Sequence, residues 1–479
     1  MASPDISFDQ IPSSIRKPGK YFEFNTKLAV RTLPPNEIKA LIIAQRIAAG
    51  SVAALVPTSV FSDADAAGYF GNGSLAHLMA RAAIKANNYL DLTVIALDDV
   101  LAGVAATGTV TITGPATAEG VIDLYVGTKD VQVAVNNGDS ATIIAAAVAA
   151  AVNALPDLPV TAAAALGVVT LTAKNKGLCG NQIPLGYIST NISGVTVAIV
   201  AMANGAADPD IQAALTVVFG TQYDIIITPY NNDTSLAELK THLETVSNAI
   251  EQRPGIGVYA VTGILAAATT LAGQLDEGRL LCAYHRYSSS TIIQSMPCEL
   301  AAAMAATMAF EEDPARPLNT LALIGIAPAN IADRLSRTEQ ENLLYNGVTP
   351  IEVGPGETVQ IVRAISTYTV DAQGVADISL LDITTIRTLD YVRAALRTRI
   401  ALRFPREKLS TKTPPRVRSE LIDVLKQLES LEIVENVTAN LPGIIVELDS
   451  QDPNRLDAKI PVDVVNGLHV FAGRIDLIL

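Results

Sequence analysis

Few residues in this chain have the types and spacing that catalysis needs. The 479 residues include only four histidines, and each lies in a separate helical or strand-like run. None adjoins a serine and an aspartate in a pattern that suggests a nucleophilic relay, and no G-x-S-x-G elbow occurs. We therefore expect no catalytic residue. The histidines are His77, His242, His285 and His469.

The cysteines and glycines carry no cofactor or metal signature either. Cys179, Cys282 and Cys298 lack paired spacing, so no zinc site is expected, and their odd number favours a reducing compartment. Cys298 follows Pro297 at a predicted helix start, where a thiolate is stabilised, but a buried structural cysteine is the preferred interpretation. Neither G-x-x-x-x-G-K-[ST] nor a strand followed by G-x-G-x-x-G occurs, so we expect no cofactor.

Charge is distributed unevenly along the chain. The formal net charge of −14 disfavours nucleic acid as the main partner, yet residues 387–418 hold ten basic and two acidic side chains. Two interpretations of this segment stay open. It forms a solvated basic face, or it forms a docking surface for an acidic protein or for copies of the same chain. The predicted helix here has an apolar stripe of Leu389, Val392, Leu396 and Ile400, flanked by Arg393 and Arg397 on one side and Arg399, Arg403 and Arg406 on the other.

The hydropathy pattern predicts a mixed α/β and β, multi-domain fold. Strand-like runs alternate with helical spacing over residues 31–98 and 206–380, which predicts one α/β core with a largely parallel sheet. Residues 99–205 carry few charges and alternate at period two around one alanine-rich helix, which predicts an inserted β-sandwich domain. Residues 381–479 predict an α+β C-terminal domain, and residues 1–30 predict an N-terminal arm.

Three segments carry more specific predictions. An Asn466-Gly467 turn predicts a hairpin between residues 459–465 and 468–479. The uncharged stretch 255–274 is too poor in large apolar side chains for a membrane span and predicts a buried strand followed by a small-residue loop or helix. The first ten residues lack the basic start and apolar run of a secretory signal, so none is expected.

Several runs, taken together and in order, resemble the tail sheath proteins of Mu-like contractile bacteriophages. The resemblance covers nearly the whole chain, and several runs in the family's order are more specific than any one alone. The runs are YDIIITPY at 223–230, SMPCELAA at 295–302, DPARPL at 313–318, TIRTLDYVR at 385–393, NRLDA at 454–458 and VFA at 470–472.

The resemblance implies a subtilisin-like α/β core without a working triad, an inserted β-sandwich and a C-terminal domain that faces an inner tube. It implies six-subunit rings that stack helically around the tail tube, and a contraction that drives the tube through the host envelope for genome delivery. The implied partners are other copies, the tail tube protein, and baseplate and tail terminator proteins, with no direct nucleic acid contact and no membrane insertion. The implied location is the virion, with assembly in the host cytoplasm.

The resemblance also implies two sets of interaction residues. The tube-facing basic helix would use Arg387, Arg393, Arg397, Arg399 and Arg403, and the inter-subunit strand arms would use Tyr21, Phe22, Phe24, Val470, Phe471, Ile475 and Leu477. The alternative is a non-sheath, hydrolase-like enzyme on the same α/β core.

Overall fold

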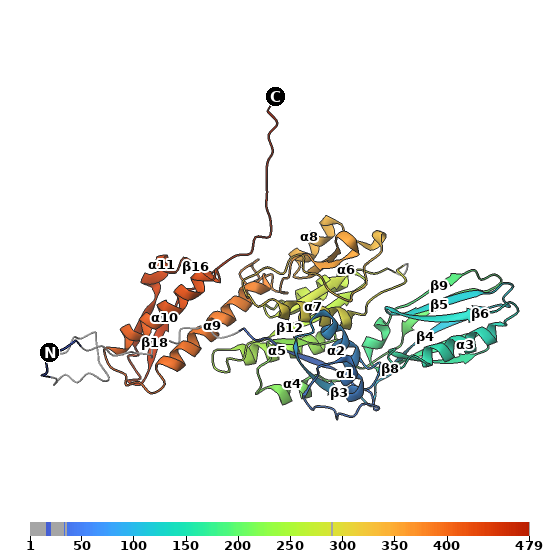
Figure 1. Cartoon of the computed structure of the whole chain (residues 1–479), viewed down its shortest axis with the longest axis horizontal. Helices are drawn as coiled ribbons and strands as arrows, with labels where there is room; N and C mark the ends of the chain where they lie inside the picture. The colour runs from blue at the N-terminus through green and yellow to red at the C-terminus, as the bar shows by residue number, and fades with distance from the viewer. Residues whose placement is uncertain (1–15, 21–32, 34–35, 289–290, 479) are drawn as a thin grey trace. The chain divides into compact units, whose positions relative to one another are not determined.

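The computed structural model describes residues 16–20, 33, 36–288 and 291–478. Figure 1 shows the helices and strands, which lie between residues 39 and 464. The chain divides into two compact units. The larger contains Asn36–Tyr391, Glu432–Glu435 and Val462–Leu479, and the smaller contains Val392–Leu431 and Asn436–Pro461.

An eight-stranded sheet forms the centre of the larger unit. The strand order is β15-β14-β13-β12-β11-β1-β3-β2, and the six inner strands pair in parallel while β15 and β2 pair antiparallel at the two edges. Because helices cover a parallel sheet, its strands read as continuous apolar runs, as in Ala40–Ala44, which is fully buried. The strands are β1 (Lys39–Gln45), β2 (Thr58–Ser59), β3 (Asp91–Leu97), β11 (Ile225–Ile227), β12 (Ile256–Thr262), β13 (Leu280–His285), β14 (Thr349–Val353) and β15 (Val359–Ile361).

Seven described helices of the larger unit, all earlier in the sequence than residue 383, accompany this sheet. α7 (Pro297–Phe310) packs against α2 and the central strands, and its buried residues are mostly alanine and methionine, whose small or flexible side chains allow close approach. The predicted strand and small-residue helix in the uncharged stretch 255–274 are present as β12 and α6. Among the described helices, none combines the length and apolar character needed to cross a bilayer. The others are α1 (Asp63–Phe70), α2 (Leu75–Ala86), α4 (Gln212–Val218), α5 (Asp233–Ser247), α6 (Leu265–Leu275) and α8 (Arg337–Tyr345).

Between β3 and β11 the chain forms a module of two antiparallel sheets and one helix. The sheet orders are β10-β4-β8-β7 and β6-β5-β9, and α3 (Ala141–Asn153), capped by Ser140, runs alongside the strands (Figure 1). Burial alternates along the strands, so each sheet has one apolar face. The strands are β4 (Ala105–Thr113), β5 (Gly120–Val126), β6 (Lys129–Val135), β7 (Val160–Ala165), β8 (Val168–Lys176), β9 (Leu185–Thr190) and β10 (Thr196–Ala203).

Polar contacts join this module to the core. The Asp99 carboxylate accepts hydrogen bonds from the Gln45 amide at 2.7 Å and the Asn175 amide at 3.1 Å. The Asp157 carboxylate pairs with Arg81 of α2 at 2.9 Å and with Lys129 of β6 at 2.7 Å. The module therefore belongs to the same compact unit as the core.

The smaller unit is a helical pair with a hairpin. It holds α9 (Ile383–Arg403) from residue 392 onward, α10 (Thr413–Ser430), α11 (Val437–Asn440) and the antiparallel strands β17 (Ile445–Leu448) and β18 (Leu456–Lys459). The division between the units falls inside α9, between Tyr391 and Val392, and the first turns of α9 pack in the larger unit through Ile383 and Ile386.

The hairpin predicted at Asn466-Gly467 is wrong. Residues 459–465 are split between β18, which pairs with β17, and β19 (Asp463–Val464), which pairs with β16 (Val434–Glu435). Residues 466–478 form neither a helix nor a strand. The turn signal was local, whereas the strands before it found partners elsewhere in the chain.

Arg279 forms a partly buried ion pair that holds α9 to the sheet, so we expect Arg279→Ala to destabilise the larger unit. Its guanidinium donates to both oxygens of Asp390, at 2.7 and 2.9 Å. Removing it takes one partner away from the Asp390 carboxylate, which lies close to the partly buried Asp224, and burial already raises the pKa of Asp224. The expected loss is about 2–4 kcal/mol in the free energy of unfolding, measured by chemical denaturation. Arg316 is exposed and lies 3.8 Å from the partly buried Glu311, so Arg316→Ala should change this free energy by less than about 0.5 kcal/mol and is the control.

The junction between module and core should weaken in acid. Burial opposes ionisation of Asp157, but Lys129 and Arg81 outweigh it and hold its pKa below the ordinary value of 3.8. A carboxyl whose pKa is lowered by folding stabilises the fold above its unfolded pKa and loses that effect as pH falls through its folded pKa. Asp157→Asn should therefore lower the thermal midpoint at pH 6, by the equivalent of about 1–2 kcal/mol, and have little effect near pH 2. An equal difference at both pH values would contradict this assignment.

Candidate functional site

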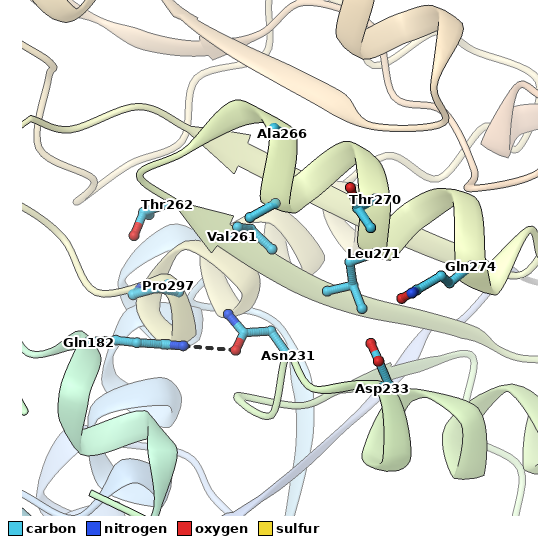
Figure 2. A pocket seen from close by; sticks show the side chains of 11 residues that line it. Gln182, Asn231, Asp233, Val261, Thr262, Ala266, Thr270, Leu271, Gln274 and Pro297 are labelled. Atoms are coloured by element: carbon cyan, nitrogen blue, oxygen red, sulfur yellow. Dashed lines mark hydrogen bonds between the residues drawn. The ribbon is translucent and has the colours of Figure 1, made fainter. Parts of the chain in front are cut away.

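One cavity of the core lies at the carboxyl ends of its central strands, where ligands bind in open α/β sheets. It has a volume of about 690 Å³ and lies between the end of β12, the start of α5 and the length of α6 (Figure 2). Gln182 of the module closes one side and donates to the side-chain oxygen of Asn231 at 2.8 Å. The lining residues are Gln182, Asn231, Asp233, Val261, Thr262, Ala266, Ala267, Thr270, Leu271, Gln274 and Pro297.

The side chains of this cavity do not form a catalytic set. Asp233 is the one ionisable residue among those that line it, and it occupies the first turn of α5, where the helix dipole stabilises a carboxylate. The Asn231 amide donates to the carbonyl of Ala260 at 3.0 Å, so it supports the chain as well as facing the cavity. The lining contains no imidazole or thiol that could act as a base or nucleophile.

His77 and Asp63 form the pair that most resembles part of a triad. The backbone N–H of Gly73 donates to His77 Nδ1 at 2.9 Å, so Nε2 carries the proton and donates to Asp63 at 2.9 Å. Both ring nitrogens are therefore engaged, and burial lowers the pKa of the ring. Ser74, the nearest serine in sequence, caps α2 by accepting from the His77 N–H. The pair is structural.

The other histidines lie apart from one another. His242 packs edge-to-face on Phe219, and burial together with Arg253 lowers its pKa to about 4. His285 is buried beside Tyr287, with ring centroids 4.7 Å apart. His469 accepts a hydrogen bond from the Asn319 amide at 2.9 Å and faces Asp382 at 3.4 Å. None of these settings joins a histidine to a nucleophile.

All three cysteines are buried. Burial raises the pKa of each thiol, and that of Cys298 rises although the residue lies at the start of α7. Desolvation therefore outweighs the helix terminus, and the interpretation of Cys298 as a structural cysteine agrees with the structure. Within the described ranges, no cluster of three His, Cys, Asp or Glu side chains is arranged to hold a metal ion.

The predicted basic helix is present as α9, but its arginines do not share one face. In the smaller unit the buried face of α9 consists of Val392, Ala395 and Arg399, which differs from the predicted apolar stripe. Arg399 therefore lies on the buried face and not beside it. Its guanidinium donates to Glu420 at 3.2 Å, to Asp423 at 2.7 Å and to Gln427 at 3.3 Å, all on α10.

Two further arginines of the set point inward. Arg403 lies 3.5 Å from Glu420 and is largely buried. Arg387, in the larger unit, is buried and donates to the carbonyl of Glu311 at 2.6 Å, and burial lowers its pKa to about 10. Arg397 is exposed and Arg393 is half-buried. The partners of Arg399 could have been found in the sequence, because the spacing of Glu420, Asp423 and Gln427 places them on one face of α10.

The strand-arm residues are only partly within the described structure. Tyr21, Phe22 and Phe24 lie outside the described residues. The C-terminal segment is described, and its large apolar side chains are exposed, with Phe471 87% and Ile475 98% accessible. Val470 and Leu477 are exposed as well, and no strand partner is present for residues 466–478 within the described chain.

Comparison with known proteins places the chain in a family. The model of the phage tail sheath protein central domain matches residues 204–367, and that of the phage tail sheath C-terminal domain matches residues 375–478. A Mu-like prophage FluMu tail sheath protein from Haemophilus influenzae is 34% identical over 490 residues, which span 99% of this chain and 100% of the relative.

Solved structures share the fold at lower identity. A sheath tail protein from Desulfitobacterium hafniense has a TM-score of 0.52 at 15% identity and covers 94% of this chain and 97% of its own. The helical sheath of the anti-feeding prophage, in its contracted state, has a TM-score of 0.50 at 12% identity. The match covers 97% of this chain and 99% of the sheath chain. These likenesses support the mixed α/β, multi-domain fold.

The full-length identity confirms the resemblance noted in the sequence and excludes the enzyme alternative, because the relatives are structural sheath proteins. The chain belongs to the phage tail sheath protein family and is a structural component of a contractile tail.

Proposed function

We propose that six copies of this protein form a ring, that rings stack helically around an inner tail tube, and that the stack contracts to drive the tube through the host envelope for genome delivery. The full-length identity of 34% to a Mu-like prophage tail sheath protein carries this proposal. One structural relative is a helical sheath in a contracted state, and another belongs to a baseplate structure.

The proposed partners are other copies, the tail tube protein, and baseplate and tail terminator proteins at the two ends. The subunit acts in the virion after assembly in the host cytoplasm. Contraction is a switch between two packings of the same subunits, with the extended packing kinetically trapped. Such a switch stores its energy during assembly, so it requires no nucleotide or metal.

The proposed domain organisation follows the sequence boundaries. Residues 31–98 with 206–380 form a subtilisin-like core without a working triad, residues 99–205 an inserted domain, and residues 381–479 a domain that faces the tube. The position of the two-sheet module between β3 and β11 supports the insertion, and the fully engaged His77 supports the missing triad.

Strand arms are the proposed links between subunits. An extended segment that joins the edge of a sheet gains main-chain hydrogen bonds that do not depend on side-chain detail. The C-terminal segment supports this role because its apolar side chains are exposed and residues 466–478 form no strand with any described part of the chain. The N-terminal residues Tyr21, Phe22 and Phe24 are proposed for the same role.

The tube contact is proposed for the exposed part of the basic helix. Arg393 and Arg397 remain candidates because they are half-buried and exposed, respectively. Arg387, Arg399 and Arg403 are proposed to act indirectly, since their guanidinium groups lie inside the chain. A buried, paired arginine holds the helix in place, and an exposed one meets an acidic surface.

The arm proposal predicts that backbone changes in the C-terminal segment matter more than side-chain changes. Ile475→Pro combined with Asp476→Pro removes two adjacent N–H groups, one of which must face the receiving strand. The matched control, Ile475→Ala with Asp476→Ala, keeps both N–H groups. We expect long striated tubes from the alanine variant and only short or absent tubes from the proline variant, observed by negative-stain electron microscopy. Equal polymer lengths would exclude strand addition by this segment.

The tube proposal predicts that reversing the charges of Arg393 and Arg397 impairs docking. Arg393→Glu with Arg397→Glu should weaken co-assembly with the cognate tail tube protein by roughly 10- to 100-fold, measured by co-sedimentation, and the effect should shrink at high salt. Thermal unfolding of the double variant separates a loss of docking caused by unfolding from one caused by the reversed charges.

Arg316→Glu with Arg337→Glu is the charge-matched control, because both residues are exposed in the larger unit and the net charge changes equally. Unchanged tube binding by the α9 variant, or equal weakening by the control, would contradict the docking assignment.

A further inference from the structure

The strand β7 forms one edge of the four-stranded sheet in the inserted module. Its sequence, Val-Thr-Ala-Ala-Ala-Ala, contains no charged residue and no proline, and the side chains of Ala163, Ala164 and Ala165 are exposed. Natural edge strands are commonly protected by charge, proline or a bulge because an open edge can pair with another chain. β7 has neither a charged residue nor a proline to protect it.

The register of β7 identifies which of its backbone groups face outward. The Lys174 N–H donates to the carbonyl of Pro159 at 2.8 Å, and the paired residues continue as Thr161 with Thr172 and Ala162 with Leu171. In an antiparallel pair the bonded residues alternate. Thr161 and Ala163 therefore point their N–H and C=O groups toward β8, and Ala162 and Ala164 point theirs away from the sheet.

The outward groups of Ala162 are already occupied by one side chain. The amide nitrogen of Asn153 donates to the Ala162 carbonyl at 2.8 Å, and the Asn153 amide oxygen accepts from the Ala162 N–H at 3.0 Å. Asn153 is the last residue of α3, which packs against β7. A side-chain amide has the donor and acceptor of a peptide group, so Asn153 takes the place of one residue of a neighbouring strand.

We propose that Asn153 blocks β7 from pairing, edge to edge, with β7 of a second copy. Two uncharged, identical strands can align antiparallel about a two-fold axis without repulsion. In the register centred on Ala163, Ala162 of each copy bonds with Ala164 of the other. Each of these two central pairs needs the N–H and C=O groups of one Ala162, which Asn153 occupies. The pairing therefore requires both Asn153 side chains to release Ala162.

The same sheet offers a matched control at its opposite side. Beyond β10, the Asn181 amide donates to the Gly205 carbonyl at 3.0 Å and its oxygen accepts from the Gly205 N–H at 2.7 Å. The bonding is the same as at Asn153, but Gly205 is buried inside the chain. Asn181→Ala removes two equivalent bonds without opening β7.

The test is disulfide trapping in the full-length chain at low protein concentration. In the proposed register the two Ala163 residues form a non-hydrogen-bonded pair, whose Cα separation of about 4.5 Å is within reach of a disulfide. Ala163→Cys introduces an exposed thiol, and the three native cysteines are buried. We expect little cross-linked dimer from Ala163→Cys alone and about tenfold more when Asn153→Ala is added, since two competing hydrogen bonds are lost.

Three further variants make the result specific. Asn181→Ala with Ala163→Cys should not form the dimer. Asn153→Asp should not either, because its carboxylate places like charges at the paired edges. Ala164→Pro, added to the Asn153→Ala and Ala163→Cys pair, removes an outward N–H that only the second copy would use and should abolish the dimer.

Thermal unfolding identifies variants that fail to fold. Should Asn153→Ala be one of them, Asn153→Ser replaces it, because its side chain is too short to bond both groups of Ala162. Folded Asn153 variants that form no more dimer than Ala163→Cys alone would overturn the proposal. Dimer formation by the Asn181→Ala control, or dimer that persists with Ala164→Pro, would overturn it as well.

Discussion

The backbone hydrogen bonds at the edges of its sheets constrain this protein more than any side-chain chemistry. Every strand has two edges, and an unpaired edge must be shortened, covered or joined by another strand. The central sheet ends in β2, only two residues long, and in β15, which pairs antiparallel. The inserted module carries Asn153 on one edge and Asn181 beyond the other. The C-terminal segment has the opposite character, because it is apolar, exposed and without a strand partner in the described chain.

The α/β core has the arrangement of a binding fold without the groups of a catalyst. A cavity lies at the carboxyl ends of the strands, yet its one carboxylate, Asp233, begins a helix. The His77–Asp63 pair has both imidazole nitrogens occupied. The fold therefore does not reveal the function here, because the same α/β architecture occurs in enzymes of many kinds and in proteins without catalytic activity. The family assignment comes from the full-length identity to a tail sheath protein and agrees with a core used for structure.

Arginines on α9 and beside it lie in two settings, buried against acidic partners or exposed on the surface. Arg399 and Arg403 meet the acidic face of α10, and Arg279 of the core binds Asp390 at the start of α9. These pairs orient the helix because each buried guanidinium needs a carboxylate or carbonyl at a defined place. Arg397, by contrast, is exposed. A count of charges along the sequence does not separate these two groups.

The sequence predicted the type of an element wherever the pattern was local, as in the buried strand β12 and the helix α9. The family followed from several motifs in order. The absence of nucleotide and hydrolase motifs could also be recognised from the sequence. The tertiary structure alone decided what depends on distant partners: the burial of Arg399 against α10, the strand β7 in an alanine run with low strand propensity, and the unpaired C-terminal segment. The reason is physical. Periodicity is a property of neighbouring residues, whereas burial and strand pairing depend on which surfaces the rest of the chain brings together.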